Sequence, residues 1–160
     1  MRITEMNGHE CRELLKRQGM GRLACARDNQ PYIVPIYFAA DADCLYGFAT
    51  VGRKIEWMRT NPLVCVQADE IQGPSDWKSV VALGRYEELS DDERHQHNRK
   101  RAIGLLALRD SWWQGAYAAD QLRQHSGDPA PVVFCVHIAE ITGLRSDPDP
   151  AQKSLDASRP

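Results

Sequence analysis

Three short apolar segments separated by tight turns, between residues 22 and 49, constrain the fold of this chain most. Residues 22–26, 31–38 and 44–49 each have the length and composition of a β-strand. Asp28-Asn29 and Asp41-Ala42-Asp43 lie between them, and such clusters are typical of turns. Connections this short join antiparallel neighbours. The pattern therefore predicts an antiparallel meander.

Three later segments also have strand character. They cover residues 63–68, 77–88 and 131–141, and a loop is predicted at residues 71–76. Most strands are linked without an intervening helix, which disfavours a doubly wound parallel sheet. The chain is therefore predicted to be mainly β, an antiparallel barrel with flanking helices.

Helical patterns interrupt the strands at three places. The first covers residues 10–18 near the N-terminus, and the second follows Lys54 and is stopped by Asn61-Pro62. A third helix is predicted over residues 90–108, before the last strand, because residues 90–93 read as a capping box. On it, Ile103, Leu106 and Ala107 are predicted to face inward.

Length and charge limit the classes of protein that fit. The 160 residues suit one domain, predicted over residues 1–145, and residues 146–160 have the composition of a disordered tail. A net charge of −2 and a pI near 6.2 give no indication of nucleic acid or an anionic membrane as partner. Without a signal-peptide pattern or a membrane-spanning apolar run, we expect a cytoplasmic protein.

The cysteines and histidines show no pattern of a disulfide framework or a metal centre. The five cysteines are odd in number and form no C-x-x-C pair, and most of them sit in apolar runs and are interpreted as small buried hydrophobes. They are Cys11, Cys25, Cys44, Cys65 and Cys135. His95 and His97 stand two residues apart on a predicted helix and cannot share one of its faces. No metal site is expected.

The segment from Thr50 to Lys54 is the strongest candidate for a binding site. It joins a strand end to a helix N-terminus, where free N–H groups and a partial positive charge favour an anion. Gly52 allows close backbone approach, and Arg53 and Lys54 add cationic donors. This combination predicts a phosphate site, although an ordinary helix start with two solvated basic residues has the same pattern.

Tryptophans mark two further candidate positions. Trp77 could form a wall beside a flat ligand and Ser79 could donate a hydrogen bond to it, or Trp77 could simply pack on the core. Trp112-Trp113 could cover a pocket, lie in a dimer contact or pack internally. No arrangement of acid, base or nucleophile stands out, which is typical of a protein whose cofactor performs the chemistry.

An ordered set of segments resembles the pyridoxamine 5′-phosphate oxidase-like flavin-binding proteins, in particular the branch of the nitroimidazole-resistance proteins. The resemblance extends over residues 10–145. The segments that carry it are residues 21–25, 30–36, 45–50, 52–55, 61–65, 77–80, 84–89 and 138–143.

The resemblance implies a split β-barrel that forms a homodimer with flavin mononucleotide (FMN) at the interface. It places the phosphate at Thr50, Gly52, Arg53 and Lys54. It places the flavin ring along Pro35, Ile36, Tyr37, Phe48 and Ala49. It also brings Trp77, Ser79 and Val80 toward the ring, from the same or from the other subunit. Residues 47–49 lack the histidine that many nitroimidazole-resistance relatives have there. The C-terminal arginine and tryptophan pattern of the true oxidase is also missing.

These features lead to a main hypothesis and two alternatives. The first is an FMN-dependent oxidoreductase that acts on a small molecule, with electrons from a nicotinamide or a reduced flavin. The second is a flavin carrier or sensor without turnover. The third is a barrel that binds heme or a deazaflavin, for which His137 is the only histidine in a predicted strand.

Overall fold

The computed structural model describes residues 1–109 and 131–147. The strands in these ranges are β1 (Arg2–Glu5), β2 (Met20–Arg27), β3 (Gln30–Asp41), β4 (Cys44–Ala49), β5 (Leu63–Gly73), β6 (Asp76–Glu88) and β7 (Val132–Asp147). The helices are α1 (Gly8–Arg17), α2 (Arg53–Thr60) and α3 (Gln96–Ala107). None of these helices has the length and apolar character needed to cross a membrane.

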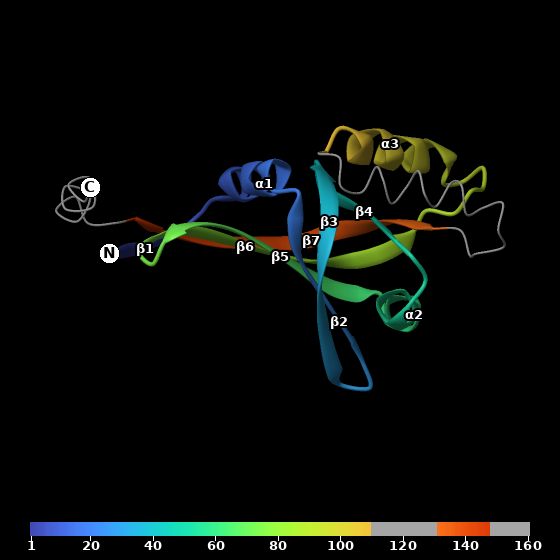
Figure 1. The fold of residues 1–160 in the computed structure, drawn as a ribbon, viewed down its shortest axis with the longest axis horizontal. Helices are drawn as coiled ribbons and strands as arrows, with labels where there is room; N and C mark the ends of the chain where they lie inside the picture. Colours follow the sequence, from blue (N-terminus) through green and yellow to red (C-terminus); the bar gives the residue numbers. More distant parts are fainter. Residues whose placement is uncertain (110–130, 148–160) are drawn as a thin grey trace, which may run out of the picture.

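Every strand pairs antiparallel, in the order β1-β7-β4-β3-β2-β5-β6, and β6 also pairs with β7. This last pairing closes the sheet into a barrel. The first half of β7 lies beside β4 and the second half beside β1, while β6 follows β7 along both halves. The extended β1, β6 and β7 therefore project to one side of the barrel (Figure 1). The predicted antiparallel, mainly β barrel is confirmed.

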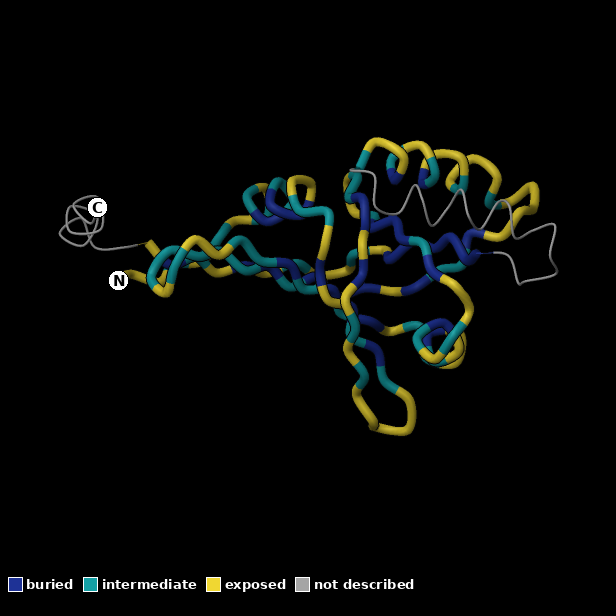
Figure 2. Tube along the Cα trace, in the orientation of Figure 1, coloured by how far each residue is buried: buried dark blue, intermediate teal, exposed yellow. Residues whose placement is uncertain are grey.

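The core lies where the strands cross, and α1 covers one side of it. Phe38, Leu45 and Phe134 are buried inside the sheet, and Leu14 and Leu15 of α1 pack into the same cluster. The buried segments gather at this crossing in Figure 2, whereas the tip of the β2–β3 hairpin is exposed. Removal of this apolar surface from water is the main stabilising contribution to such a fold.

Local sequence signals explain several element boundaries. The Asp28-Asn29 turn has φ of 51° and 61°, the left-handed region that Asp and Asn tolerate, and it joins β2 to β3. At α1, Asn7 Oδ1 accepts a hydrogen bond from the Glu10 N–H at 2.9 Å, and Glu10 Oε2 accepts one from the Asn7 N–H at 2.8 Å. This capping box starts the helix at Gly8, ahead of the predicted residue 10.

The predicted start of the third helix is wrong. Residues 91–95 form bends and turns, and α3 begins at Gln96. The Asp92 side chain accepts a hydrogen bond from the backbone N–H of His95 at 2.9 Å, so a local Asx contact replaces the predicted helical turn. On α3 the buried residues are Ala102 and Leu106, whereas Ala107 is exposed and not inward-facing as predicted.

Two strand ends and one whole strand also differ from the predictions. The predicted loop at residues 71–76 is mostly strand, because Ile71 pairs with Trp77 and Gly73 with Asp76. The strand β1 has no counterpart in the predictions. It pairs with β7 through Ser146 and Asp147, which were assigned to the tail, and the buried Ser146 hydroxyl donates to the Ser75 carbonyl at 3.0 Å. Residues 148–160 and Trp112-Trp113 lie outside the described residues.

Candidate functional site

A cleft of about 720 Å³ opens where β3, the end of β4 and the first turn of α2 meet. We call it the α2 cleft. It brings together the predicted residues of β3 and β4 with Thr50 and Lys54. Its lining residues are Arg17, Gly19, Met20, Pro35, Ile36, Tyr37, Phe38, Phe48, Ala49, Thr50, Lys54, Leu106 and Arg109.

The walls of the α2 cleft are mainly apolar and partly aromatic. Pro35 and Tyr37 lie on the outward face of β3, because the residue between them, Ile36, points into the core. Phe48 of β4 and Leu106 of α3 add further apolar surface. A cleft with flat apolar walls and a few polar groups suits a planar organic ligand.

Lys54 is the charged residue of the cleft whose environment favours a bound anion. It is half-buried in the first turn of α2, and burial lowers the pKa of its ammonium group below the usual value. It forms no ion pair with a carboxylate in residues 1–109 or 131–147. The N-cap of α2, Gly52, has no side-chain cap, so N–H groups at this helix end are also open to a ligand. Together they favour an anion such as a phosphate.

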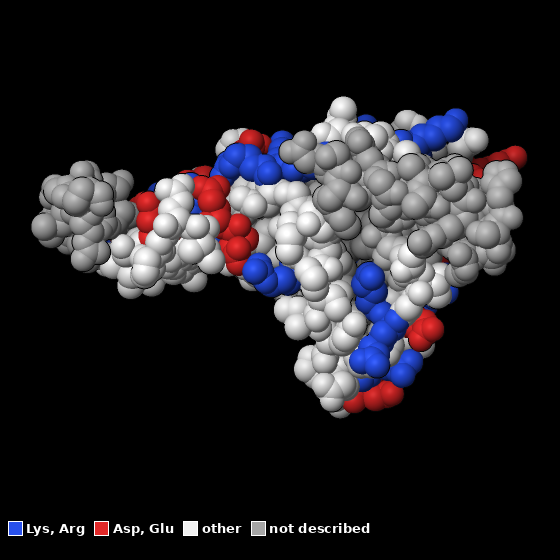
Figure 3. Space-filling view, viewed as in Figure 1, with Lys and Arg blue, Asp and Glu red and all other residues white. Residues whose placement is uncertain are grey.

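Gly52 and Arg53 flank the cleft but are not among its lining residues. The Arg53 guanidinium lies 5.4 Å from the centroid of the Tyr32 ring, which in turn packs on Trp57 at 5.5 Å. A Cβ atom at Gly52 would meet no atom within 4 Å, so no protein contact requires glycine there. Basic side chains gather over α2 and the adjoining β2–β3 hairpin (Figure 3). A role of Gly52 and Arg53 toward a phosphate stays a prediction.

Two arginines of the cleft were missed by sequence reasoning. Arg17 ends α1 and pairs with Glu70 at 3.2 Å, and Arg109 follows α3 and donates to the carbonyl groups of Lys16 and Arg17. Burial lowers the pKa of Arg109. No local signal identifies either residue, because the two helix ends meet only in the folded chain.

The structure places Trp77 and Ser79 away from the α2 cleft. They line a second pocket of about 650 Å³ between β6 and β7, with Val81 and Leu144. Val80, between Ser79 and Val81, is fully buried in the core, so its side chain faces neither pocket. Cross-strand pairs run from Pro35 through Arg22 and Gln67 to Val81, which separates β3 from β6 by three strand spacings of about 4.8 Å.

The α2 cleft and the second pocket open on the same face of the sheet, which carries several exposed apolar side chains around a polar group of Arg22, Gln67 and Asp69. Directly paired residues share a face, and the row from Ile33 through Ala24 and Cys65 to Leu83 crosses this surface. We call it the outer face. Its exposed large apolar residues are Met20, Ile33, Tyr37, Leu63, Ile71, Leu83 and Leu144. Several large apolar side chains exposed on one face indicate an interaction surface.

Comparison with known proteins decides the family. The family model described as pyridoxamine 5′-phosphate oxidase matches residues 7–145. The chain belongs to the pyridoxamine 5′-phosphate oxidase family. The resemblance seen in the sequence is thereby confirmed.

Relatives from several bacteria support this assignment. An uncharacterized protein of Rhizobium meliloti (strain 1021) is 41% identical over 143 residues, which cover 89% of this chain and 95% of that protein. An FAD-binding protein from Mesorhizobium loti, known from its crystal structure, has 38% sequence identity to this chain. The two structures superpose with a TM-score of 0.73, over 92% of this chain and 100% of that one. A candidate 5-nitroimidazole antibiotic resistance protein from Bacteroides thetaiotaomicron shares the fold at 16% identity, with a TM-score of 0.61 over 92% and 93% of the two chains.

Proposed function

We propose that this protein is a flavin-dependent oxidoreductase whose cofactor binds in the α2 cleft. The observation that carries the proposal is the half-buried Lys54, unpaired with any described carboxylate, at the end of a cleft with flat apolar walls. A buried cation without a counter-ion is costly, and a bound anion removes that cost. A flavin nucleotide has the matching parts, a planar ring system and a phosphate.

Different residues of the cleft bind the ring system and the phosphate. Tyr37, Pro35 and Phe48 pack against the ring system, while Lys54 and the open N–H groups of α2 hold the phosphate. The Thr50 hydroxyl, exposed beside them, donates to the same phosphate. The flavin, when bound, supplies hydride and electron transfer between a donor and a small acceptor, so the protein needs no nucleophile of its own.

FMN and FAD share the groups that this cleft recognises. FAD differs from FMN by an adenylate attached to the phosphate, so the ring system and the first phosphate of either nucleotide can make the same contacts with the cleft. FMN is the smaller ligand that satisfies all of them, and it is the cofactor we propose. The relative from Mesorhizobium loti is named an FAD-binding protein, and parallel titrations with FMN and FAD therefore belong in the same experiment.

The outer face supports a homodimer as part of this proposal. Its apolar residues would be buried by a second copy, and a two-fold arrangement could bring Trp77 and Ser79 of the partner subunit toward the flavin. Ser79 already accepts a hydrogen bond from the Gln67 side chain at 3.1 Å, which orients its hydroxyl on this face. The five cysteines are unpaired, as expected for a cytoplasmic location, which we also propose.

The dimer can be tested with Leu83→Asp, a charge in the central row of the outer face. We expect the wild type to be a dimer and the variant a monomer by light scattering. Burial of an unpaired carboxylate costs several kcal/mol. Because the partner completes the site, flavin affinity should fall at least about tenfold, which corresponds to about 1.4 kcal/mol. His97→Asp on the exposed face of α3 is the control. A monomeric wild type would contradict the proposal.

Electron transfer is tested by anaerobic addition of NADH or NADPH to the flavin-loaded protein. The proposal predicts bleaching of the long-wavelength flavin band and its recovery when a small acceptor is added. The other outcome is a flavin that binds and yet is reduced neither by a nicotinamide nor by dithionite-reduced free flavin. That result would favour the carrier or sensor alternative. A heme Soret band or a deazaflavin spectrum in the purified protein would point to the third alternative.

A further inference from the structure

Three metal-ligating side chains meet on the strands β4 and β7, away from the α2 cleft. Cys44 pairs directly with His137, and Tyr46, two residues along β4, pairs with Cys135. Residues two apart on a strand share a face, so Cys44, Cys135 and His137 all lie on one face of the sheet. Phe48 of the cleft lies on the same face but four residues further along β4, about 13 Å from Cys44.

The ligand atoms are close enough to share one ion. The two Sγ atoms and a ring nitrogen of His137 all lie within 4.8 Å of one another. Cys44 Sγ is 3.6 Å from His137 Nδ1. Zinc–sulfur and zinc–nitrogen bonds of about 2.3 and 2.05 Å at a tetrahedral angle place sulfur and nitrogen about 3.6 Å apart. The distance from Cys44 Sγ to His137 Nδ1 therefore already matches the sulfur–nitrogen distance of a zinc site.

His137 is oriented by a carboxylate on the side away from Cys44. Its Nε2 lies 2.5 Å from Glu87 Oε2. A carboxylate oxygen at this distance accepts a hydrogen bond from Nε2–H, which leaves Nδ1, on the side of Cys44 Sγ, available to a metal. A histidine oriented in this way by a carboxylate is the usual arrangement at protein metal sites.

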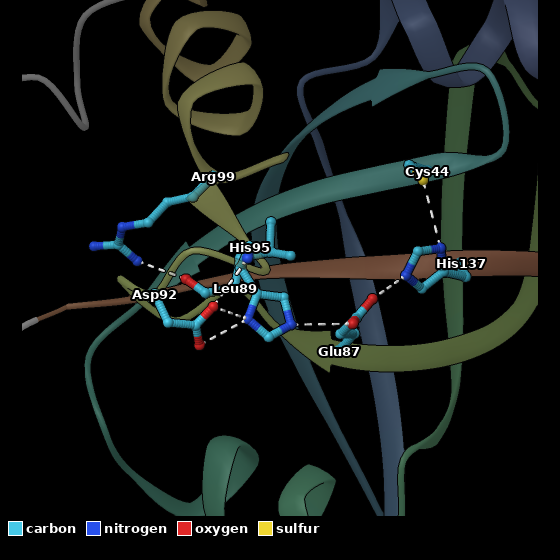
Figure 4. A network of polar contacts seen from close by, with 7 residues as sticks. All are labelled: Cys44, Glu87, Leu89, Asp92, His95, Arg99 and His137. Carbon is cyan, nitrogen blue, oxygen red and sulfur yellow. Dashed lines mark hydrogen bonds and ion pairs between the residues drawn. The ribbon is translucent and has the colours of Figure 1, made fainter. Parts of the chain in front are cut away.

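A chain of contacts fixes Glu87 in turn. His95 Nε2 lies 3.3 Å from Glu87 Oε1, and His95 Nδ1 lies 2.9 Å from Asp92 Oδ1. Figure 4 shows this line from Asp92 through His95, Glu87 and His137 to Cys44. The side chain of His137 is about half-exposed, with 46% of its surface accessible, so an ion can enter from solvent.

A disulfide between the two cysteines is a poorer interpretation of the same cluster. Cys135 is the diagonal neighbour of Cys44 and not its direct partner. Diagonal neighbours in an antiparallel pair have Cα atoms about 7–8 Å apart, beyond the usual reach of a disulfide of about 6.8 Å. A metal ion between the sulfur atoms needs no such approach of the backbones.

We propose that Cys44, Cys135 and His137 bind a divalent ion that prefers thiolate ligands, Zn²⁺ in the first place, with the fourth coordination position open to solvent. Two thiolates and one imidazole select zinc over magnesium or calcium, which prefer oxygen. Each thiol releases its proton to solvent when it coordinates. Glu87 is a positioning residue, since it acts on the ion only through His137.

The test is a titration of the reduced, full-length protein with Co²⁺ as a spectroscopic substitute for zinc. We expect a thiolate-to-cobalt charge-transfer band and intense visible bands of tetrahedral cobalt, saturating at one ion per chain and displaced by Zn²⁺. Cys44→Ser, at a half-buried position, should remove the charge-transfer contribution of one thiolate. Glu87→Gln should weaken cobalt binding about 10- to 100-fold while the bands of the bound state persist.

Cys65→Ser is the matched control, because Cys65 lies on β5 outside the cluster. It should titrate as the wild type does. Failure of the wild type to develop the bands would overturn the proposal without reference to any variant. The proposal would equally be overturned if Cys65→Ser and Cys44→Ser changed the spectrum alike, or if oxidation produced a Cys44–Cys135 disulfide in a protein that binds no cobalt.

Discussion

Replacement of Lys54 by methionine should weaken flavin binding about 10- to 100-fold, equivalent to about 1.5–3 kcal/mol for a charge-assisted hydrogen bond to a phosphate. Methionine keeps most of the length of the side chain and removes the ammonium group, with its charge and its hydrogen-bond donors. The ammonium group is half-buried and has no carboxylate partner among the described residues, so the apoprotein should be as stable as the wild type or more so. Flavin fluorescence titration and thermal melting of the apoprotein measure the two effects.

Arg53→Met is the matched control for Lys54→Met. Arg53 neighbours Lys54 in the chain, but its guanidinium stacks on Tyr32 and is not part of the cleft lining. We expect its loss of affinity to be clearly smaller than that of the Lys54 variant. Equal losses would mean either that Arg53 also contacts the phosphate or that long-range charge alone attracts the flavin, and an unchanged affinity of Lys54→Met would place the phosphate elsewhere.

The lowered pKa of Lys54 also has a pH signature. Because burial depresses the folded-state pKa below the unfolded value, the unfolded chain binds more protons between the two. The Lys54 contribution to apoprotein stability should therefore rise with pH in this alkaline window. Flavin affinity should fall in the same window as the ammonium loses its proton, and Lys54→Met should show neither change.

Phe134→Ala should lower the free energy of unfolding by about 3–5 kcal/mol, the range for loss of a buried aromatic ring. Phe134 is 1% exposed, and its ring packs on Tyr86 with 5.5 Å between the centroids. It also covers Gly47 on the paired strand, where a Cβ atom would lie 2.3 Å from the ring. The ring therefore fills space that only a glycine leaves open. Urea unfolding followed by circular dichroism measures the loss.

The contact with Gly47 makes a double-mutant cycle informative. Gly47→Ala alone should cost about 1–3 kcal/mol by overpacking. Combined with Phe134→Ala, the new methyl group occupies part of the vacated space, so the double variant should lose less than the sum of the single losses. Gly104→Ala, where no atom lies within 4 Å of the new Cβ, is the control and should stabilise α3 by up to about 1 kcal/mol. Additive losses would show that the two residues do not share this space.

Elements controlled by nearby residues could be predicted from the sequence. The β2–β3 turn at Asp28-Asn29, the strand Cys44–Ala49 and the end of α2 before Pro62 all depend on residues within a few positions. The start of α3 was predicted wrongly although it is local, because Asp92 can cap either a helix or a turn.

Features that depend on register between distant strands could not be predicted. The strand β1 forms by pairing of residues 2–5 with residues 144–147, and the end of β7 is held between β1 and β6. The same holds for the cluster of Cys44 with Cys135 and His137, whose strands are far apart in the sequence. Of the candidate site, Thr50 and Lys54 are predicted from the strand-to-helix pattern and the β3 and β4 residues through the family resemblance, whereas Arg17 and Arg109 enter the cleft only through packing of two helix ends.

The most direct test is an absorption spectrum of the purified full-length protein after incubation with FMN or FAD and removal of free flavin by desalting. A flavin spectrum retained at one flavin per chain, and lost from Lys54→Met under the same conditions, is the result we expect. Titrations with the two nucleotides then show which one binds more tightly. A protein that is folded by circular dichroism and retains neither FMN nor FAD would contradict the assignment of the α2 cleft as a flavin site.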